Sequence, residues 1–294
     1  FEAIHEFFRL NDFYEVQAPM FINVAVEGGA TLFSLKYFEK GDVYLTQSSQ
    51  FYLEALIFSL EKVYTIAPSF RAEKSRTRRH LTEFWHAEAE MAWYSMNDII
   101  DFEEKLITYI VRKVLEKNID ELKLLNRDLE KLECIKPPFY RITYDDALRR
   151  LEEKEIYVEW GDDLGADEEY ALTIDFNKPI FIYGYPEKIK AFYHKNDPNR
   201  PEVTLSVDLL APEGYGEIIG GGERIENEKD LIEKIKRFGL NPKDYEWYID
   251  LRRYGSVPHS GFGLGVDRLV WWICGLEYIT DAIPFPRTIR RIYP

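Results

Sequence analysis

Basic side chains crowd one short stretch of an otherwise acidic chain. Residues 63–91, VYTIAPSFRAEKSRTRRHLTEFWHAEAEM, indicate a β-hairpin because two apolar-rich segments flank a charged turn. Around this turn lie Arg71, Arg76, Arg78, Arg79 and His80. The 294-residue chain has a formal net charge of −14, so clustered cations point to an anion, and guanidinium groups match the oxygens of a polyphosphate. The alternative is a solvated turn whose arginines pair with Glu73 and Glu83.

Two features of the hairpin favour a nucleotide. Arg71 belongs to the apolar strand and is predicted to point into a pocket, while Phe84 and Trp85 offer an aromatic face to a purine. The stretch resembles motif 2 of class II aminoacyl-tRNA synthetases, in the aspartyl/asparaginyl subgroup, whose pattern is F-R-x-E, a variable loop and R-H-L-x-E-F. That family has an α+β fold, an antiparallel sheet flanked by helices. The resemblance implies that ATP is bound by Arg71, Glu73, Arg79, His80, Leu81 and Phe84.

A second segment, residues 208–225, combines carboxylates with glycines. Asp208 and Glu217 bracket a tight turn, so both could face one cation, and few oxygen ligands beside phosphates describe Mg²⁺. Gly220 to Gly222 would let the sheet pass close under a ligand and permit a bulge that brings Arg224 to the face of Glu217. An edge hairpin with incidental charge is the alternative. By resemblance, Glu217 and Ile218 bind ATP, Glu217 and Asp208 hold the metal, and Gly220 and Arg224 contact the amino acid.

A third segment, residues 254–275, places glycines at 261, 263 and 265 before an apolar helix that runs through Cys274. A dinucleotide-binding fold is excluded because no βαβ unit precedes the glycines, and a P-loop lysine is absent. The segment resembles motif 3 of the same family. This implies that Gly265 and Arg268 contact ATP, with Arg268 and backbone amides at the helix start neutralising the terminal phosphates.

The amino-acid pocket is predicted from two loops near the N-terminus. By resemblance, Glu27 in Glu27-Gly28-Gly29-Ala30 holds the α-ammonium group, and Gln50 and Tyr193 contact the substrate. Leu53 stands where aspartyl enzymes usually carry a lysine, so Leu53-Glu54 follows the asparaginyl pattern. Residues 161–165 indicate a turn, with a solvated turn favoured over a carboxylate-metal loop.

Several segments are expected to position these groups. A helix over residues 1–10 and a strand over 13–19 resemble motif 1, about residues 1–20, which implies a homodimer. A long amphipathic helix, capped by Asn97, is predicted to end near Asn118. Further expected elements are a surface helix over 144–153, strands over 179–186 and 203–210, and a helix over 229–238 stopped by Gly239.

The amino-acid composition limits the classes of protein to which the chain can belong. The hydrophobic content is 46% and the aromatic content 15%, which indicates a globular chain. No apolar run reaches membrane-spanning length, so no membrane is expected, and two cysteines suit a reducing cytoplasm.

Together these parts predict an AMP-forming ligase, in which a carboxylate attacks the α-phosphorus of ATP. Arg71 and Arg268 are the candidate catalytic residues, and Mg²⁺ is the expected cofactor. The resemblance covers residues 1–294 as one catalytic domain without an anticodon-binding domain, and the net charge opposes tRNA binding.

The sequence is therefore interpreted as similar to the archaeal asparagine synthetases related to asparaginyl-tRNA synthetase. These convert aspartate, ATP and ammonia to asparagine, AMP and pyrophosphate through a β-aspartyl-adenylate. Aspartate would then bind reversed, with its α-carboxylate on Arg224, and His86 is a candidate for handling the proton of ammonia or else a structural histidine. The alternatives are the catalytic core of an asparaginyl-tRNA synthetase and a catalytically inactive paralogue that binds tRNA or regulates.

Overall fold

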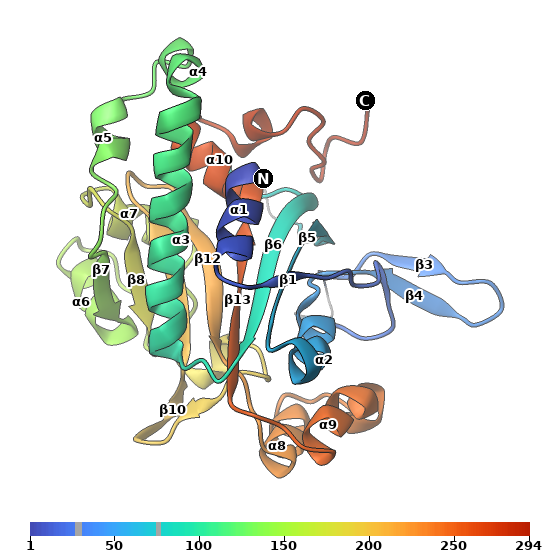
Figure 1. The fold of residues 1–294 in the computed structure, drawn as a ribbon. Helices are drawn as coiled ribbons and strands as arrows, with labels where there is room; N and C mark the ends of the chain where they lie inside the picture. The colour runs from blue at the N-terminus through green and yellow to red at the C-terminus, as the bar shows by residue number, and fades with distance from the viewer. Residues whose placement is uncertain (27–30, 75–77) are drawn as a thin grey trace.

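An eight-stranded sheet forms the centre of the protein in the computed structural model, which describes residues 1–26, 31–74 and 78–294 (Figure 1). The strand order is β1-β5-β6-β13-β12-β11-β8-β7. The bounds are β1 Tyr14–Glu15, β5 Lys62–Phe70, β6 Glu83–Ala92, β13 His259–Gly265, β12 Gly216–Glu223, β11 Ser206–Ala211, β8 Ile180–Tyr183 and β7 Tyr140–Thr143. The β1–β5 and β7–β8 pairs at the two edges are parallel and the other pairs are antiparallel. The predicted antiparallel sheet flanked by helices is thus confirmed, with parallel pairs added at its edges.

Three helices cover one face of the sheet: α1 (Glu2–Leu10), α3 (Met96–Lys117) and α10 (Val266–Cys274). Figure 1 shows α1 beside the long α3 in front of the strands. Phe8, Phe102 and Phe262 meet in the main apolar core between these layers. Each large apolar side chain buried here contributes roughly 1.5–3 kcal/mol, which makes this face the scaffold of the molecule.

Strand β6 shows how the sheet separates its two faces. Ala87, Ala89 and Met91 join the apolar core, whereas His86, Glu88 and Glu90 point to the opposite face and line cavities there. The alternation follows from the two-residue period of a strand. On β6, the polar side chains therefore point to the face that the helices leave open.

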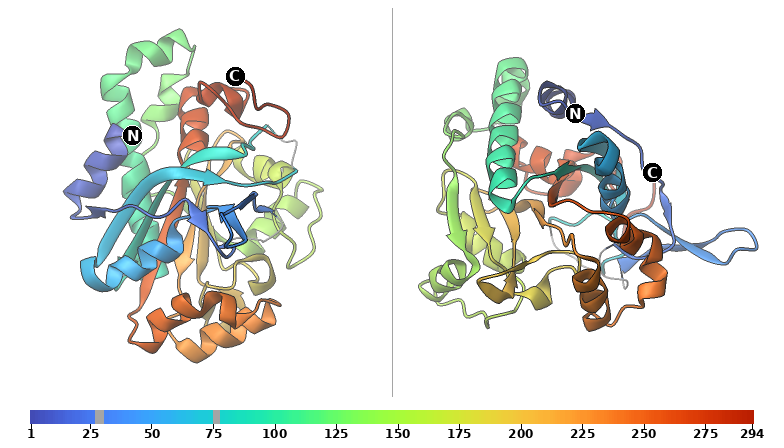
Figure 2. Two further views of the ribbon diagram at one scale, coloured as in Figure 1. Left: turned by 90° about the vertical axis from the view of Figure 1, so that its right-hand side faces the viewer. Right: turned by 60° about the horizontal axis from the view of Figure 1, so that its bottom comes forward.

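Smaller elements surround the open face. Below the sheet in Figure 1 lie α8 (Glu228–Arg237) and α9 (Glu246–Arg253), which share an apolar cluster with the start of α2 (Gln50–Leu60). The strands β2 (Phe21–Ile22), β4 (Asp42–Leu45) and β3 (Ser34–Lys36) form a sheet that projects from the body, and Figure 2 shows it from two other sides. The remaining elements are α4 Ile119–Leu124, α5 Leu129–Glu133, α6 Tyr144–Glu152, α7 Ala166–Thr173, β9 Asn196–Asp197, β10 Arg200–Thr204, and 3₁₀ helices at Glu187–Ile189, Pro242–Tyr245 and Ile279–Ala282.

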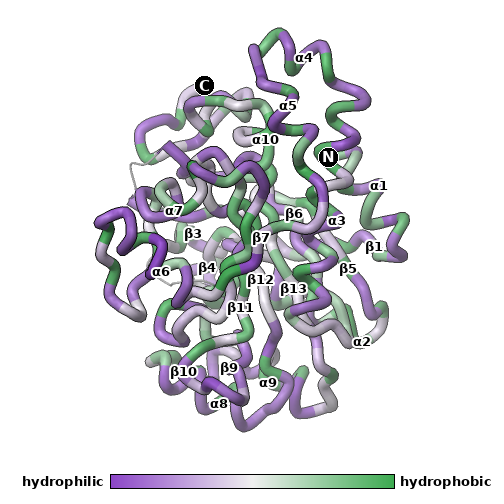
Figure 3. The backbone as a smooth tube through the Cα atoms, turned by 90° about the vertical axis from the view of Figure 1, so that its left-hand side faces the viewer, coloured by the Kyte–Doolittle hydropathy of each residue, from purple (hydrophilic) through white to green (hydrophobic). Residues whose placement is uncertain are grey.

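Hydropathy follows this layering. Figure 3 shows apolar segments running through the sheet, while α6 at its edge is mostly hydrophilic. Within the described ranges, no helix combines the length and apolar content needed to cross a bilayer.

Most predicted elements are present, with three local corrections. The long helix is capped by Ser95, not Asn97, because the Ser95 side chain accepts from the Asp98 amide and Asp98 reciprocates in a capping box. The strand expected over 13–19 shrinks to Tyr14–Glu15, and the strand expected over 203–210 is divided between β10 and β11. The helix stopped by Gly239 is confirmed, and this glycine has a φ of 72° that suits a residue without a side chain.

Candidate functional site

Two adjoining cavities open on the polar face of the sheet. The first, here called the hairpin cavity, has a volume of about 280 Å³ and lies against the β5–β6 hairpin. The second, the inner cavity, has a volume of about 260 Å³ and reaches toward α2 and Arg224. Both are lined by Arg71, His86, Asp163, Ile189, Lys190, Asp208, Glu217 and Gly263. A ligand in one cavity would therefore share its boundary with a ligand in the other.

The structure brings together all ten residues that the sequence assigned to ATP. Arg71, Glu73, Arg79, His80, Leu81, Phe84, Glu217, Ile218, Gly265 and Arg268 all line the hairpin cavity. Of the residues assigned to the amino acid, Gln50, Arg71, Tyr193, Gly220 and Arg224 line the inner cavity. Glu27 lies outside the described residues, as does Arg76 of the hairpin turn.

The hairpin places Arg71 at the junction of the two cavities. Phe70 pairs with Glu83 at the end of the ladder, and the Arg71 amide then donates to the Thr82 carbonyl oxygen at 3.0 Å. Arg71 thus lies one residue beyond β5, and its side chain reaches into the pocket as the sequence predicted. Its guanidinium carbon lies 5.5 Å from the centroid of the Phe84 ring.

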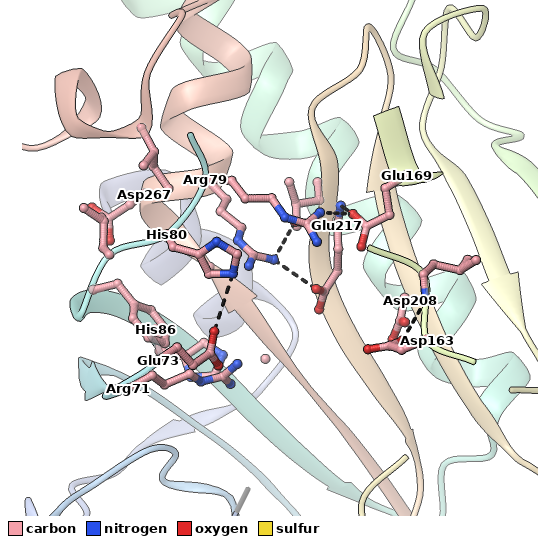
Figure 4. A pocket seen from close by; sticks show the side chains of 18 of the residues that line it. Arg71, Glu73, Arg79, His80, His86, Asp163, Glu169, Asp208, Glu217 and Asp267 are labelled. Carbon is pink, nitrogen blue, oxygen red and sulfur yellow. Dashed lines mark hydrogen bonds and ion pairs between the residues drawn. The ribbon is translucent and has the colours of Figure 1, made fainter. Parts of the chain in front are cut away.

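His80 and Glu73 face each other across the hairpin cavity, as Figure 4 shows. The His80 Nε2 atom lies 3.5 Å from a Glu73 carboxylate oxygen. Burial, together with the charges of Arg268, Arg79 and Arg71, lowers the pKa of His80 to about 4. His80 is therefore neutral at pH 7 and acts there as a hydrogen-bonding group without charge.

Arg79 forms an ion pair with Glu169 of α7, a residue that the sequence did not single out (Figure 4). The same Glu169 carboxylate accepts a hydrogen bond from the Glu217 backbone amide at 2.7 Å. Only 12% of the Arg79 side chain is exposed, so α7 holds the guanidinium in place. The expected alternative partners, Glu73 and Glu83, lie on the hairpin itself, whereas this partner comes from 90 positions along the chain.

Arg268, in the first turn of α10, forms an ion pair with Glu217 of β12. Its Nη1 atom donates to both the backbone oxygen and a carboxylate oxygen of Glu217, each at 2.9 Å. Burial alone would raise the pKa of Glu217, but the charges of Arg268, Lys190 and Arg79 outweigh it and lower the pKa to about 2. Glu217 is thus an anion held among cations.

Asp208 and Glu217 reach the same point above the sheet. A side-chain carbon added at Gly220 would lie 3.0 Å from a Glu217 carboxylate oxygen and 3.4 Å from an Asp208 oxygen. Lys190 pairs with Asp208 at 2.5 Å, and burial raises the pKa of Asp208 to about 6. Within residues 1–26, 31–74 and 78–294, no group of three or more acidic, histidine or cysteine side chains could hold a metal ion. Two carboxylate donors fit Mg²⁺ only where phosphate oxygens and water complete its coordination.

Arg224 in the inner cavity is already engaged by the protein. Its Nη2 atom donates to Glu90 at 2.6 Å, and only 3% and 2% of the two side chains are exposed. The guanidinium also lies 5.2 Å from the centroid of the Tyr193 ring. The positive charge that Arg224 offers to a ligand is therefore largely neutralised by Glu90.

The bulge expected in the glycine-rich strand is present at a different residue. The β11–β12 register shifts between Leu209, opposite Ile219, and Leu210, opposite Glu217, so Ile218 is the extra residue. Gly220 and Gly221 both line the inner cavity, although a side chain at Gly221 would also meet the backbone of Gly261 and Phe262. Gly222 lines neither cavity, and a side chain there would meet the backbone of Leu205 and Ser206. The prediction that all three glycines clear space for a ligand is thus wrong for Gly222, which serves close strand packing.

Several cavity residues escaped the sequence analysis. Lys190 and Glu169 stand in unremarkable charged segments, and only their long-range contacts reveal them. Asp163 lies in the turn over 161–165, where a solvated role was favoured, yet it lines both cavities. Glu88 and Glu90 carried a usable signal, since charged residues alternating with alanines in a strand predict one polar face.

Comparison with known proteins gives consistent matches over the whole chain. The family described as "tRNA synthetases class II (D, K and N)" matches residues 1–289. The asparagine–tRNA ligase of Pyrococcus abyssi is 58% identical over 292 residues, covering 99% of this chain and 67% of that protein. The crystal structure of asparaginyl-tRNA synthetase from Pyrococcus horikoshii, complexed with asparaginyl-adenylate, matches with a TM-score of 0.98 and 57% identity, covering all of this chain and 67% of that one. The Entamoeba histolytica enzyme in complex with asparaginyl-adenylate matches with a TM-score of 0.90 and 39% identity, covering 66% of that chain.

These matches overturn the interpretation as a core-only asparagine synthetase. That interpretation depended on the missing anticodon-binding domain and the net charge. The chain spans about two thirds of the length of these relatives, so a missing domain carries no information about the acceptor. Net charge is a sum over the whole surface and does not describe any local surface. The predictions that depended on this interpretation are therefore wrong as well: ammonia as a substrate, a β-aspartyl-adenylate intermediate and aspartate bound in the reversed orientation.

Proposed function

The chain belongs to the class II tRNA synthetases of the D, K and N group, and we propose that it is the catalytic domain of an asparaginyl-tRNA synthetase. It would condense asparagine with ATP to asparaginyl-adenylate and pyrophosphate, then transfer the asparaginyl group to tRNA. The names of the relatives support this function, and their two structures with asparaginyl-adenylate support the first step. The broader prediction of an AMP-forming ligase agrees with the family.

One observation carries the proposal: the two cavities meet at Arg71. Asparagine carboxylate and ATP are both anions, so the main barrier to their reaction is repulsion and misalignment. Arg71 would bridge the carboxylate in the inner cavity and the α-phosphate in the hairpin cavity. Arg79 and Arg268 would bind the departing pyrophosphate through their charge, and the neutral His80 through a hydrogen bond. Fixed positive charge and alignment would then supply the catalysis without a protein nucleophile.

The adenine ring has a site on the same hairpin. Phe84 lines the hairpin cavity and could stack on the base, with Glu73 and Leu81 beside it. Gly265 and Ile218 would leave room on the sheet for the ribose and phosphates. These assignments extend the residue-by-residue resemblance to motifs 2 and 3.

Mg²⁺ would be held by Glu217 and Asp208 together with the phosphates of ATP, and would supply charge neutralisation at those phosphates. The Asp208 carboxylate forms an ion pair with the Lys190 ammonium group in this structure. To bind the metal, Asp208 would have to give up this ion pair. Lys190 would turn toward a phosphate instead.

The inner cavity favours a neutral side chain. Leu53 is fully buried in an apolar cluster at the position where aspartyl enzymes usually carry lysine, so position 53 supplies no counter-charge to a second substrate carboxylate. The lysine that does line the inner cavity, Lys190, pairs with Asp208. Arg224 is paired with Glu90 and therefore offers hydrogen bonds with little net charge. An amide suits this setting better than a carboxylate, which supports asparagine as the substrate.

We further propose that residues 1–294 act as one catalytic domain and pair with a second copy through α1 and β1. The motif 1 resemblance supports this pairing, and the exposed side chains of Phe1, Leu10 and Tyr14 provide an apolar surface for it. tRNA is the proposed acceptor on the evidence of the relatives' names.

The decisive experiment measures exchange of radiolabelled pyrophosphate into ATP without tRNA. Asparagine should support exchange, and aspartate at the same concentration should support little. Exchange driven by aspartate in place of asparagine would contradict the proposed substrate, and no exchange with either would contradict the activation step. Charging of tRNA, measured with labelled asparagine, then tests the second step.

A further inference from the structure

A fully buried polar network lies behind the inner cavity, and none of the roles proposed above uses it. It centres on Glu54 of α2, whose partners Tyr248, Arg252 and His259 come from α9 and the start of β13. The side chains of Glu54, Arg252 and His259 have no exposed surface. Burying charge so completely is costly unless every group is satisfied, so this arrangement calls for a reason beyond stability.

Glu54 is held as a carboxylate anion. Its oxygens accept from the Tyr248 hydroxyl at 2.8 Å, from Arg252 Nη2 at 2.5 Å and from His259 Nε2 at 3.0 Å. The other ring nitrogen of His259, Nδ1, lies 2.7 Å from the Val257 carbonyl oxygen, so both ring nitrogens have a partner inside the network. Burial alone would raise the pKa of Glu54, but the charges of Arg252 and His259 hold the pKa well below its usual range.

Gln50 connects this network to the cavity. It lies one helical turn before Glu54 and lines the inner cavity with 6% of its surface exposed. Its Nε2 atom donates to Glu54 at 3.0 Å. An ionised carboxylate only accepts hydrogen bonds, so the amide NH₂ of Gln50 must face Glu54. The second atom of the amide, Oε1, is then fixed in orientation as well.

We infer that Glu54 is a positioning residue that locks the Gln50 amide so that its Oε1 accepts an N–H group of the bound amino acid. The inference rests on the proposed function, since it takes the inner cavity as the asparagine site. Without Glu54 the amide can rotate by half a turn and present NH₂ to the substrate, where it would oppose the N–H donors of asparagine.

Arg252 extends the same control to the other side of the cavity. Its Nε atom donates to the Ile225 carbonyl oxygen at 2.8 Å, next to Arg224 in the chain. Arg252 therefore hydrogen-bonds both the Glu54 carboxylate and the backbone next to Arg224. The α8–α9 helix pair, which contributes nothing to the hairpin cavity lining, thereby shapes the amino-acid site.

The test is a double-mutant cycle in asparagine-dependent pyrophosphate exchange, with Glu54→Gln, Gln50→Leu and the double variant. Glu54→Gln should raise KM for asparagine by about tenfold, the equivalent of one hydrogen bond to a charged group. KM for ATP should change by less than about twofold, because Glu54 lies outside the hairpin cavity. Adding Glu54→Gln to Gln50→Leu should raise KM for asparagine no further. Effects that multiply in the double variant would overturn the inference, because Glu54 would then act without Gln50.

Glu213→Gln is the matched control. Glu213 forms a two-point ion pair with Arg127 at 3.0 and 2.6 Å, and it lines neither cavity. The control should leave KM for asparagine unchanged, which separates loss of a paired carboxylate from loss of the Gln50 orientation.

Removing the Glu54 charge leaves Arg252 unpaired and could prevent folding. In that event Tyr248→Phe replaces it, since this change keeps both charges and removes only the hydroxyl that donates to Glu54 and accepts from Arg252. KM for asparagine should then rise by about threefold with Gln50 present and not at all in Gln50→Leu. An unchanged KM with Gln50 present would overturn the inference. Loss of asparagine-dependent exchange in the unaltered protein would instead contradict the proposed function.

Discussion

The hairpin cavity and the network behind the inner cavity hold charge in opposite ways. In the hairpin cavity the Arg268 and Glu217 side chains are 21% and 34% exposed, although the Arg79–Glu169 pair there is more deeply buried. Behind the inner cavity Arg252 and Glu54 are fully buried, and Arg224 and Glu90 nearly so. Partly exposed pairs can exchange partners when a charged ligand arrives, whereas separating a buried pair costs several kcal/mol. The difference suggests that one region moves charge during the reaction and the other defines the shape of the amino-acid site.

The largest effect is expected where the buried network is broken. Arg252→Met should lower the free energy of unfolding by about 3–5 kcal/mol, because Glu54 loses its main counter-charge in a dry site. Urea denaturation followed by fluorescence measures the loss. Arg253→Met, which removes the neighbouring arginine whose side chain is 43% exposed, is the control and should cost much less. Equal losses in the two variants would remove the distinction between the regions.

The next effect concerns rate and not stability. Arg71→Ala should lower the rate of pyrophosphate exchange by about tenfold to a few hundredfold, from the loss of a hydrogen bond between charged groups worth roughly 1.5–3 kcal/mol. The melting temperature should stay close to that of the unaltered protein, because the hairpin ladder does not depend on this side chain. Near-normal exchange would contradict the placement of Arg71 between the reactants.

Ser95, which caps helix α3 away from both cavities, provides a reference for the size of a purely structural effect on stability. Ser95→Ala should cost about 1 kcal/mol of stability through loss of the α3 cap, with unchanged KM values. Asn97→Ala, two residues later, should cost less because Asn97 is not the capping residue. A larger loss in Asn97→Ala would reverse the assignment of the cap.

The smallest effect is expected in the pH dependence of the hairpin cavity. The pKa of His80 is lowered to about 4, so His80 stays neutral from pH 6 to 8 and gains its proton only as the pH falls toward 4. The ratio of kcat/KM for ATP between the unaltered protein and His80→Gln should therefore change by less than about twofold over that range. A ratio that shifts steeply near pH 6.5 would indicate a titrating histidine and a more hydrated cavity.

Local pattern was sufficient for the part of the hairpin cavity that the hairpin itself contributes. Arg71, His80 and Phe84 belong to one hairpin, where a two-residue period and a short turn determine which side chains meet. The helix cap was mistaken because Ser95 and Asn97 are both good capping residues, and only the reciprocal contact with Asp98 distinguishes them. The asparagine synthetase interpretation failed because it depended on what the chain lacked, and a chain that spans two thirds of its relatives cannot support that argument.

The sequence by itself determined the groups that could bind a polyphosphate, the strands and helices that carry them, and the family resemblance in three motifs. The tertiary structure alone decided that Glu169 holds Arg79, that Glu90 neutralises Arg224, and that Arg252 pairs with Glu54. Glu54 and Arg252 are separated by 198 positions, so no local period relates them. Their contact exists only because α9 packs against α2, where burial removes water and makes each charge depend on its partner.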